Sequence, residues 1–156
     1  KKTSAGNEER LKAPLNLSIG AVLRMDNQGR KFLELRYRIV NAGQEEISFN
    51  KTIEKGNNLF FEMISPKKEK IFVPKKEKVF TSQRIFVRKN VASLGAGQSF
   101  DGSIQAYPED YPGYTAGEYS IKAYADIYKD LPTEKSPEIL QRLVSDPITF
   151  NIPAVN

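Results

Sequence analysis

The sequence contains no cysteine, no histidine and no tryptophan. Without cysteine and histidine, the chain has no thiol nucleophile, no Cys/His zinc site and no Ser-His-Asp triad. The commonest general base at neutral pH is missing as well. Nothing in the sequence pairs two acids in a cleft, and no spacing of acids matches a Ca²⁺-binding loop. We therefore expect a protein that is not an enzyme and that uses no metal and no cofactor.

Long hydrophobic runs are also absent. No apolar stretch approaches the ~18 residues that a membrane-spanning helix needs. Residues 1–13 have almost no apolar content and no period, which predicts a flexible tether. This tether is either a frayed terminus or the spacer behind a removed export or lipoprotein signal. Periplasm or cell surface is the location we expect, although a chain without cysteine fits the cytoplasm equally.

The remaining residues, 14–156, suit one domain of ordinary size. Hydrophobic residues alternate with polar ones over Leu15–Leu23, Leu33–Ile39, Tyr119–Ile127 and Ile148–Ile152, which is the period of a half-buried strand. Eight or nine short strands separated by turns predict an all-β antiparallel sandwich with at most one short helix. The core residues we expect are Leu33, Leu35, Tyr37, Ile39, Tyr119, Ile121 and Phe150.

Shorter strands and one ambiguous segment complete the pattern. Further strands are expected near residues 47–49, 59–64, 71–73, 79–80, 84–88 and 100–106. Ser136-Pro137-Glu138 has the residue types of a helix start, and Ile139, Leu140, Leu143 and Val144 fit one helical face. This segment predicts either a short helix or an extended crossover between the last two strands.

The segment LGAGQSFDGSIQAYPEDYPGYTAGEYSIKAYADI, Leu94 to Ile127, is similar to immunoglobulin-like sandwiches of exported bacterial proteins. In those sandwich domains, a Gly-rich turn and a strand precede a Gly-x-Tyr motif at the start of the penultimate strand. Gly117-Glu118-Tyr119 has this position here. The layout also resembles a bacterial family of intracellular proteinase inhibitors and the accessory domains of some secreted metalloproteases. The resemblance implies that Tyr119 forms a tyrosine corner, whose hydroxyl hydrogen-bonds backbone a few residues upstream.

A tandem repeat, PKKEKIFV followed by PKKEKVFT from Pro66 to Thr81, is the first candidate binding feature. Its lysines could dock on phosphate-rich polymer, lipid headgroups or an acidic protein. Alternatively, they protect exposed strand edges, where proline and lysine prevent edge-to-edge pairing. The candidate residues are Lys67, Lys68, Lys70, Lys75, Lys76 and Lys78.

The loop YPEDYPGY is the second candidate. Tyr107, Tyr111 and Tyr114 could form a rigid aromatic platform for a sugar or a peptide, because Pro108 and Pro112 restrict the backbone. The alternative is a crossover loop whose rings pack on the end of the sandwich.

The formal charge of +5 favours acidic surfaces but is a weak footprint for nucleic-acid binding. We therefore expect a non-catalytic, extracytoplasmic bacterial module that recognises a protein or polysaccharide through its end loops. Contact with a membrane is expected only through an N-terminal lipid anchor. The alternative function is a proteinase inhibitor that inserts one exposed loop into its target.

Overall fold

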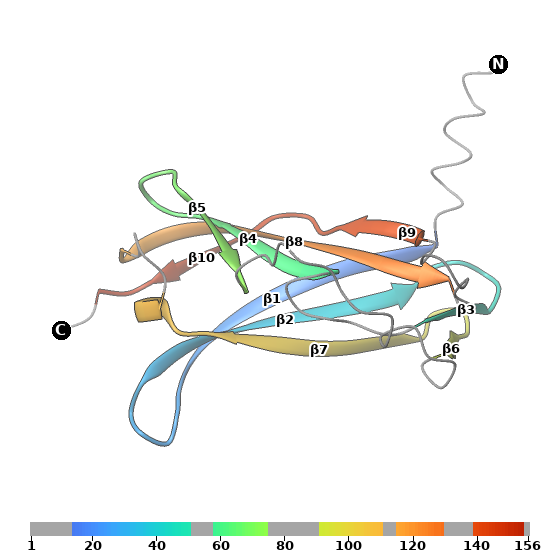
Figure 1. Ribbon diagram of the computed structural model, residues 1–156, viewed down its shortest axis with the longest axis horizontal. Helices are drawn as coiled ribbons and strands as arrows, with labels where there is room; N and C mark the ends of the chain where they lie inside the picture. The colour runs from blue at the N-terminus through green and yellow to red at the C-terminus, as the bar shows by residue number, and fades with distance from the viewer. Residues whose placement is uncertain (1–13, 51–57, 75–90, 111–114, 130–138, 155–156) are drawn as a thin grey trace, which may run out of the picture.

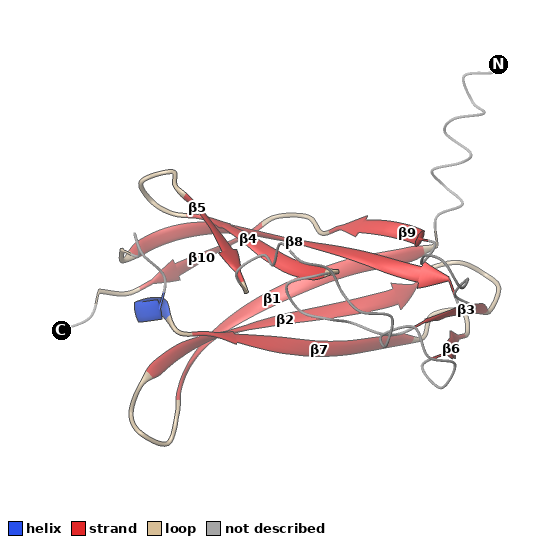
Figure 2. Cartoon of the chain, in the orientation of Figure 1, coloured by secondary structure: helices blue, strands red, loops and turns tan. Residues whose placement is uncertain are grey.

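The chain folds into two antiparallel β-sheets around one shared core (Figure 1, Figure 2). The computed structural model describes residues 14–50, 58–74, 91–110, 115–129 and 139–154. No helix in these ranges is long and apolar enough to cross a membrane. The strands are β1 (Leu15–Met25), β2 (Lys31–Asn41), β3 (Ile47–Asn50), β4 (Leu59–Ile64), β5 (Lys70–Val73), β6 (Val91–Leu94), β7 (Ser99–Ala106), β8 (Gly117–Lys129), β9 (Ile139–Val144) and β10 (Ile148–Ile152), with a 3-10 turn, η3 (Pro108–Asp110), after β7.

The smaller sheet has the order β1-β2-β7, and the larger sheet is built around β8. One edge of β8 pairs with β4 and then β3, whereas the other edge pairs with β10 and then β9. The larger sheet continues to β5 beyond β4 and to β6 beyond β3. The predicted all-β antiparallel sandwich is confirmed.

The alternation of the long strands places one side of each in the core. Leu35 and Ile39 of β2 and Ile121 of β8 are fully buried, while Arg36 and Arg38 between them are exposed. Fully burying such a side chain contributes about 1.5–3 kcal/mol. The expected core residues are all found there: Leu33, Leu35, Tyr37, Ile39, Tyr119 and Ile121 are buried, and Phe150 is partly buried against them.

The segment after Pro137 is a strand, so the helical alternative for residues 139–144 is wrong. β9 pairs antiparallel with β8, from Ile139 opposite Tyr128 to Val144 opposite Tyr124. β10 covers only the first part of this edge of β8, which leaves backbone groups that β9 satisfies. Leu143 is buried opposite Ala125. The extended alternative therefore describes the segment.

The described ranges hold ten strands. Two of them were not expected as strands from the alternation: β9, and β6, which directly precedes the turn at residues 95–98. The strands expected near residues 79–80 and 84–88, like the tether at residues 1–13, lie outside the described residues. The strand expected at residues 59–64 is β4, which has a partner on each side and so lies inside its sheet.

Tyr119 forms the predicted tyrosine corner. Its fully buried side chain donates a hydrogen bond from the hydroxyl to the Thr115 carbonyl oxygen at 2.6 Å and accepts one from the Thr115 N–H at 3.0 Å. Gly117, between them, has a φ of 133°, a conformation that residues with a Cβ rarely adopt. A Cβ at this position would also collide with Pro66. The Gly-x-Tyr spacing thus has a direct steric and hydrogen-bonding reason.

Asn41 connects two loops at the opposite end of the sandwich, one between β2 and β3 and the other between β6 and β7. Its fully buried side chain donates from Nδ2 to the carbonyls of Glu45 and Leu94, both at 2.8 Å, and accepts from the Gly43 N–H at 2.8 Å. These bonds join two connections that are far apart in the sequence. They hold two strands of the smaller sheet, β2 and β7, in fixed positions at this end.

Candidate functional site: the arginine face

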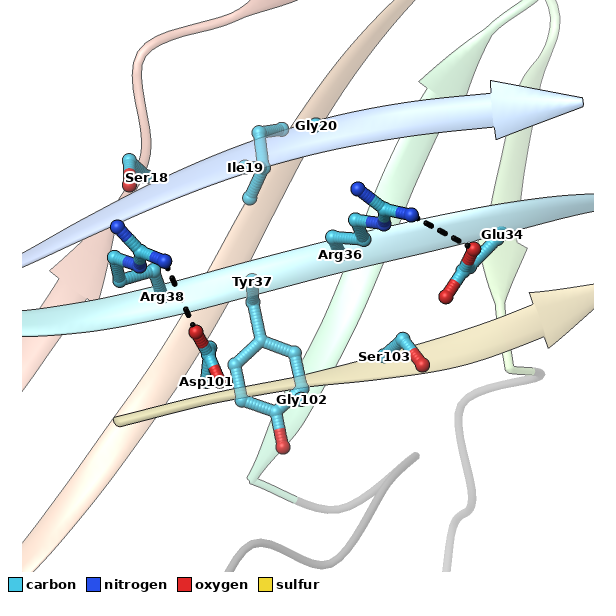
Figure 3. A pocket seen from close by; sticks show the side chains of 10 residues that line it. All are labelled: Ser18, Ile19, Gly20, Glu34, Arg36, Tyr37, Arg38, Asp101, Gly102 and Ser103. Atoms are coloured by element: carbon cyan, nitrogen blue, oxygen red, sulfur yellow. Dashed lines mark hydrogen bonds and ion pairs between the residues drawn. The ribbon is translucent and has the colours of Figure 1, made fainter. Parts of the chain in front are cut away.

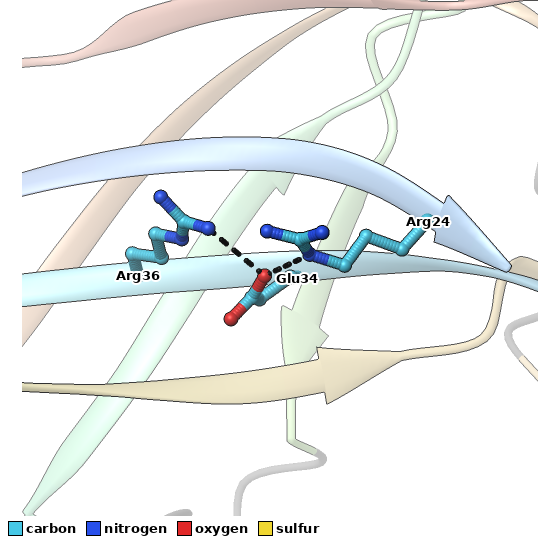
Figure 4. A network of polar contacts seen from close by, with 3 residues as sticks. All are labelled: Arg24, Glu34 and Arg36. Atoms are coloured by element: carbon cyan, nitrogen blue, oxygen red, sulfur yellow. Dashed lines mark hydrogen bonds and ion pairs between the residues drawn. The ribbon is translucent and has the colours of Figure 1, made fainter. Parts of the chain in front are cut away.

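The outer side of the smaller sheet carries a row of polar side chains. Arg36 of β2 lies opposite Gly20 of β1 and Ser103 of β7, and Arg38 lies opposite Ser18 and Asp101. Directly opposed residues project from the same side of a sheet, and the alternate β2 residues fill the core. We call this surface, formed by Ser18, Gly20, Arg24, Glu34, Arg36, Arg38, Asp101 and Ser103, the arginine face; Figure 3 shows all of these residues except Arg24, which Figure 4 shows.

The arginine face contains an open groove of about 510 Å³. Its sides are low because small residues flank the arginines, and a Cβ added at Gly20 would meet no atom within 4 Å. Tyr37 supports the groove where its ring passes Gly102 (Figure 3). A Cβ at Gly102 would collide with this ring, so the close approach of β7 to Tyr37 requires glycine.

Three guanidinium groups and two carboxylates give the arginine face one net positive charge. Arg36 Nη2 lies 3.3 Å from Glu34 Oε1, and Arg38 Nη2 lies 3.1 Å from Asp101 Oδ2. Arg24 Nε also donates to Glu34 Oε1, so this oxygen accepts from two arginines (Figure 4). The side chains of Arg36 and Arg38 remain 49% and 58% exposed. Most of their N–H donors therefore face solvent.

The ionisation of the arginine face suits anion binding rather than proton transfer. The hydrogen bond from Arg24, reinforced by Arg36, lowers the pKa of Glu34, so Glu34 is ionised at neutral pH and is a weak base. Burial, with a contribution from Asp101, raises the pKa of Tyr37 and keeps its hydroxyl neutral. Guanidinium groups stay protonated and donate to carboxylates in a planar fork. In the described part of the chain, no three acids gather as a metal site.

The first copy of the basic repeat forms the turn between β4 and β5. Ser65 closes this turn, because its hydroxyl oxygen accepts from the N–H groups of Lys67 and Glu69. Lys67 and Lys68 are exposed, whereas Lys70 begins β5 and pairs with Glu62 at 3.2 Å. Since β5 is the last strand in its sheet order, this arrangement fits edge protection. The second copy, with Lys75, Lys76 and Lys78, lies outside the described residues.

Tyr107 packs against its neighbours. Its ring lies under the Arg30 guanidinium, 4.2 Å from Cζ to the ring centroid, and 5.4 Å from the Phe32 ring. Its hydroxyl donates to Asp26 Oδ2 at 2.9 Å, and this bond is the main reason that the pKa of Tyr107 is raised. These contacts favour a structural role. Tyr111 and Tyr114 lie outside the described residues, so the binding role of the loop stays a prediction.

The larger sheet carries an aromatic cluster on its outer side. The Phe60 and Tyr124 rings stack at 5.0 Å with planes 16° apart, and Phe72 meets Phe60 edge-on at 5.6 Å. Tyr124 also donates to Glu62, which Lys70 pairs with. Phe60 and Tyr124 each cover one face of the other, and Lys122 Nζ lies 5.8 Å from the Tyr124 ring centroid, so these rings pack mainly on one another and on Lys122. The arginine face is therefore the better candidate for a binding site.

The sequence patterns identify only part of the arginine face. They place Arg36 and Arg38 on the polar side of a strand, yet Gly20, Asp101 and Ser103 carry no signal of their own. The signal that could have identified this face is the pair of arginines at alternate positions of one strand. A solvent-facing strand position needs only a polar residue, so two arginines there are more than the fold requires. Their neighbours are set by strand register between segments far apart in the sequence.

Comparisons with known proteins leave the chain without an assigned family. No family model matches it, and no curated protein matches it. Among solved structures, the structural-genomics target SoR45 is 6% identical with a TM-score of 0.47, and the match covers 90% of this chain and 88% of that one. β-Glucosidase 3B from Thermotoga neapolitana, solved with α-D-glucose, is 17% identical with a TM-score of 0.34 and matches 88% of this chain and 16% of that one. At these TM-scores neither similarity identifies a function.

Proposed function

We propose that the domain is a non-catalytic binding module that holds an anionic macromolecule on the arginine face. The observation that carries this proposal is the open groove over Arg36 and Arg38, two half-exposed guanidinium groups flanked by Gly20, Ser103 and Ser18, with Asp101 beside Arg38. The groove is open to solvent, so a chain can enter it without a change in the backbone. The charge of the face attracts an anion and repels a cation.

The existing ion pairs leave the arginines available. Exposed ion pairs contribute little to folding, because solvent screens them and the long side chains lose entropy. A ligand carboxylate can therefore replace Glu34 or Asp101 at one arginine without loss of the fold. The same carboxylates limit nonspecific attraction, since they leave a single net charge on the face. Binding should accordingly depend on salt but should not require a high positive charge.

Titration calorimetry with poly-L-glutamate tests this proposal. Replacing both Arg36 and Arg38 by Thr keeps residues that favour strands and should weaken binding at least tenfold, as expected for the loss of two charge-assisted contacts of roughly 1 kcal/mol each. The matched control replaces Lys67 by Ser and Lys68 by Asn, which removes the same charge from an exposed turn. The dissociation constant of the control variant should stay within about threefold of that of the parent, because two exposed charges away from the site act only through the net charge of the protein.

Two results would contradict the proposal. If both variants weaken binding equally, net charge alone is responsible and the arginine face is not a site. If only the lysine variant weakens binding, the basic repeat is the site. The proteinase-inhibitor alternative depends on an exposed loop, and residues 75–90, 111–114 and 130–138 lie outside the described residues. That alternative, like the predicted exported location, stays a prediction.

A further inference from the structure

We infer that the ligand of the arginine face is an extended peptide segment with acidic residues at alternate positions. This inference rests on the proposed function and adds the ligand class to it. Arg36 and Arg38 are two residues apart on β2 and project from the same side. Their Cα atoms are therefore separated by about 6.6–6.8 Å, the repeat of a strand. An extended peptide presents its own alternate side chains with the same repeat, so two carboxylates meet two guanidinium groups at once.

The shape of the groove favours a ligand that lies along β2. Gly20 on β1 and Ser103 on β7 flank Arg36, and Ser18 on β1 and Asp101 on β7 flank Arg38, so three of the four flanking residues are small (Figure 3). These low sides leave space for a backbone parallel to the strand, while the arginines rise between them. Ser18 is exposed, and a hydroxyl can both donate to a peptide carbonyl and accept from a peptide N–H. The groove thus offers partners for the backbone as well as for the acids.

The order of charges favours a patterned peptide over a uniformly charged polymer. Glu34 precedes Arg36 along the same side of β2, and Asp101 lies beside Arg38. Glu34 is held ionised between Arg24 and Arg36 (Figure 4). A polymer with a charge at every unit would place an anion against Glu34, where like charges repel. A peptide can instead place acids over the two arginines and a neutral or basic residue over Glu34.

Fluorescence anisotropy with two labelled peptides of equal composition tests the inference. One contains Ser-Asp-Ser-Asp-Ser and the other contains Ser-Asp-Asp-Ser-Ser between identical glycine ends. Adjacent acids point to opposite sides of an extended chain, so the second peptide offers one carboxylate to the face. The alternating peptide should bind about two- to fivefold tighter, as one additional exposed ion pair predicts. This preference should vanish when Arg36 and Arg38 are both replaced by Thr, in a variant whose circular dichroism matches the parent.

The remaining outcomes separate the inference from the proposed function. If the two peptides bind equally while poly-L-glutamate still depends on the arginines, the inference fails and the proposed function stands. If polygalacturonate binds more tightly per charge than the alternating peptide, the ligand is an acidic polysaccharide and the peptide inference is wrong. If none of these polyanions depends on Arg36 and Arg38, both the inference and the proposed function are wrong.

Discussion

Replacing Tyr119 by Phe tests the tyrosine corner on which the larger sheet depends. The hydroxyl donates to the Thr115 carbonyl at 2.6 Å and accepts from the Thr115 N–H at 3.0 Å, and the side chain is fully buried. Each bond contributes roughly 1 kcal/mol net. The ring remains in place in the variant, so no apolar contact is lost. We expect the free energy of unfolding to fall by about 2 kcal/mol, or roughly 4–8 °C in Tm for a domain of this size.

Urea denaturation followed by circular dichroism measures this loss, with the slope m unchanged if the denatured state is unaffected. The matched control is Tyr124→Phe, the same substitution on the outer side of the same strand. Tyr124 donates one hydrogen bond to Glu62, which keeps its pairing with Lys70. The control should lose less than about 1 kcal/mol. Equal losses in the two variants, or a loss below about 0.5 kcal/mol for Tyr119→Phe, would refute the reasoning.

Two further predictions concern stability. Asn41→Ala removes three hydrogen bonds from a fully buried side chain and should lower the free energy of unfolding in urea by about 3 kcal/mol. The control Gln44→Ala, at an exposed position, should change it by less than about 0.5 kcal/mol. A similarly small change for Asn41→Ala would show that Asn41 does not hold this end together. Burial raises the pKa of Glu62, but hydrogen bonds from Tyr124 and Lys70 outweigh it, so the net pKa lies below its ordinary value of 4.5. A lowered folded pKa stabilises the protein above the unfolded value, so the contribution of Glu62 should be fully present above about pH 4.5 and be lost at lower pH. Glu62→Gln should reduce this loss in urea titrations carried to about pH 3, and an unchanged profile would contradict the assigned cause.

The fold was predictable where local pattern and tertiary structure agree. Leu35 and Ile39 alternate with Arg36 and Arg38, and only a half-buried strand satisfies that pattern. The segment from Ile139 to Val144 was ambiguous, because its apolar residues fit a helical face as well as a strand. Its conformation is decided by the edge of β8 that β10 leaves uncovered, and single-segment patterns contain no information on that edge.

The candidate site was less predictable for a related reason. Arg38 and Asp101 are 63 residues apart in the sequence, and only the register of β2 with β7 brings them together. The sequence around Asn41 predicts only a turn, and the hydrogen bond from Asn41 to the Leu94 carbonyl spans 53 residues. Tyrosines and lysines in loops give visible sequence signals, yet Tyr107 is hydrogen-bonded to Asp26 and Lys70 is paired with Glu62. Polar residues on a sheet face are less conspicuous because each one alone is ordinary.

Amide chemical-shift mapping by NMR during titration with poly-L-glutamate tests the central claim most directly. A ligand on the arginine face should shift the amides of Ser18, Gly20, Arg36, Arg38 and Ser103, with the largest changes at the two arginines. The shifts should diminish as salt rises, because screening weakens exposed charge pairs. Shifts confined to the lysine turn at residues 66–69 or to the loop after Tyr107, with the amides of β2 unchanged, would contradict the account.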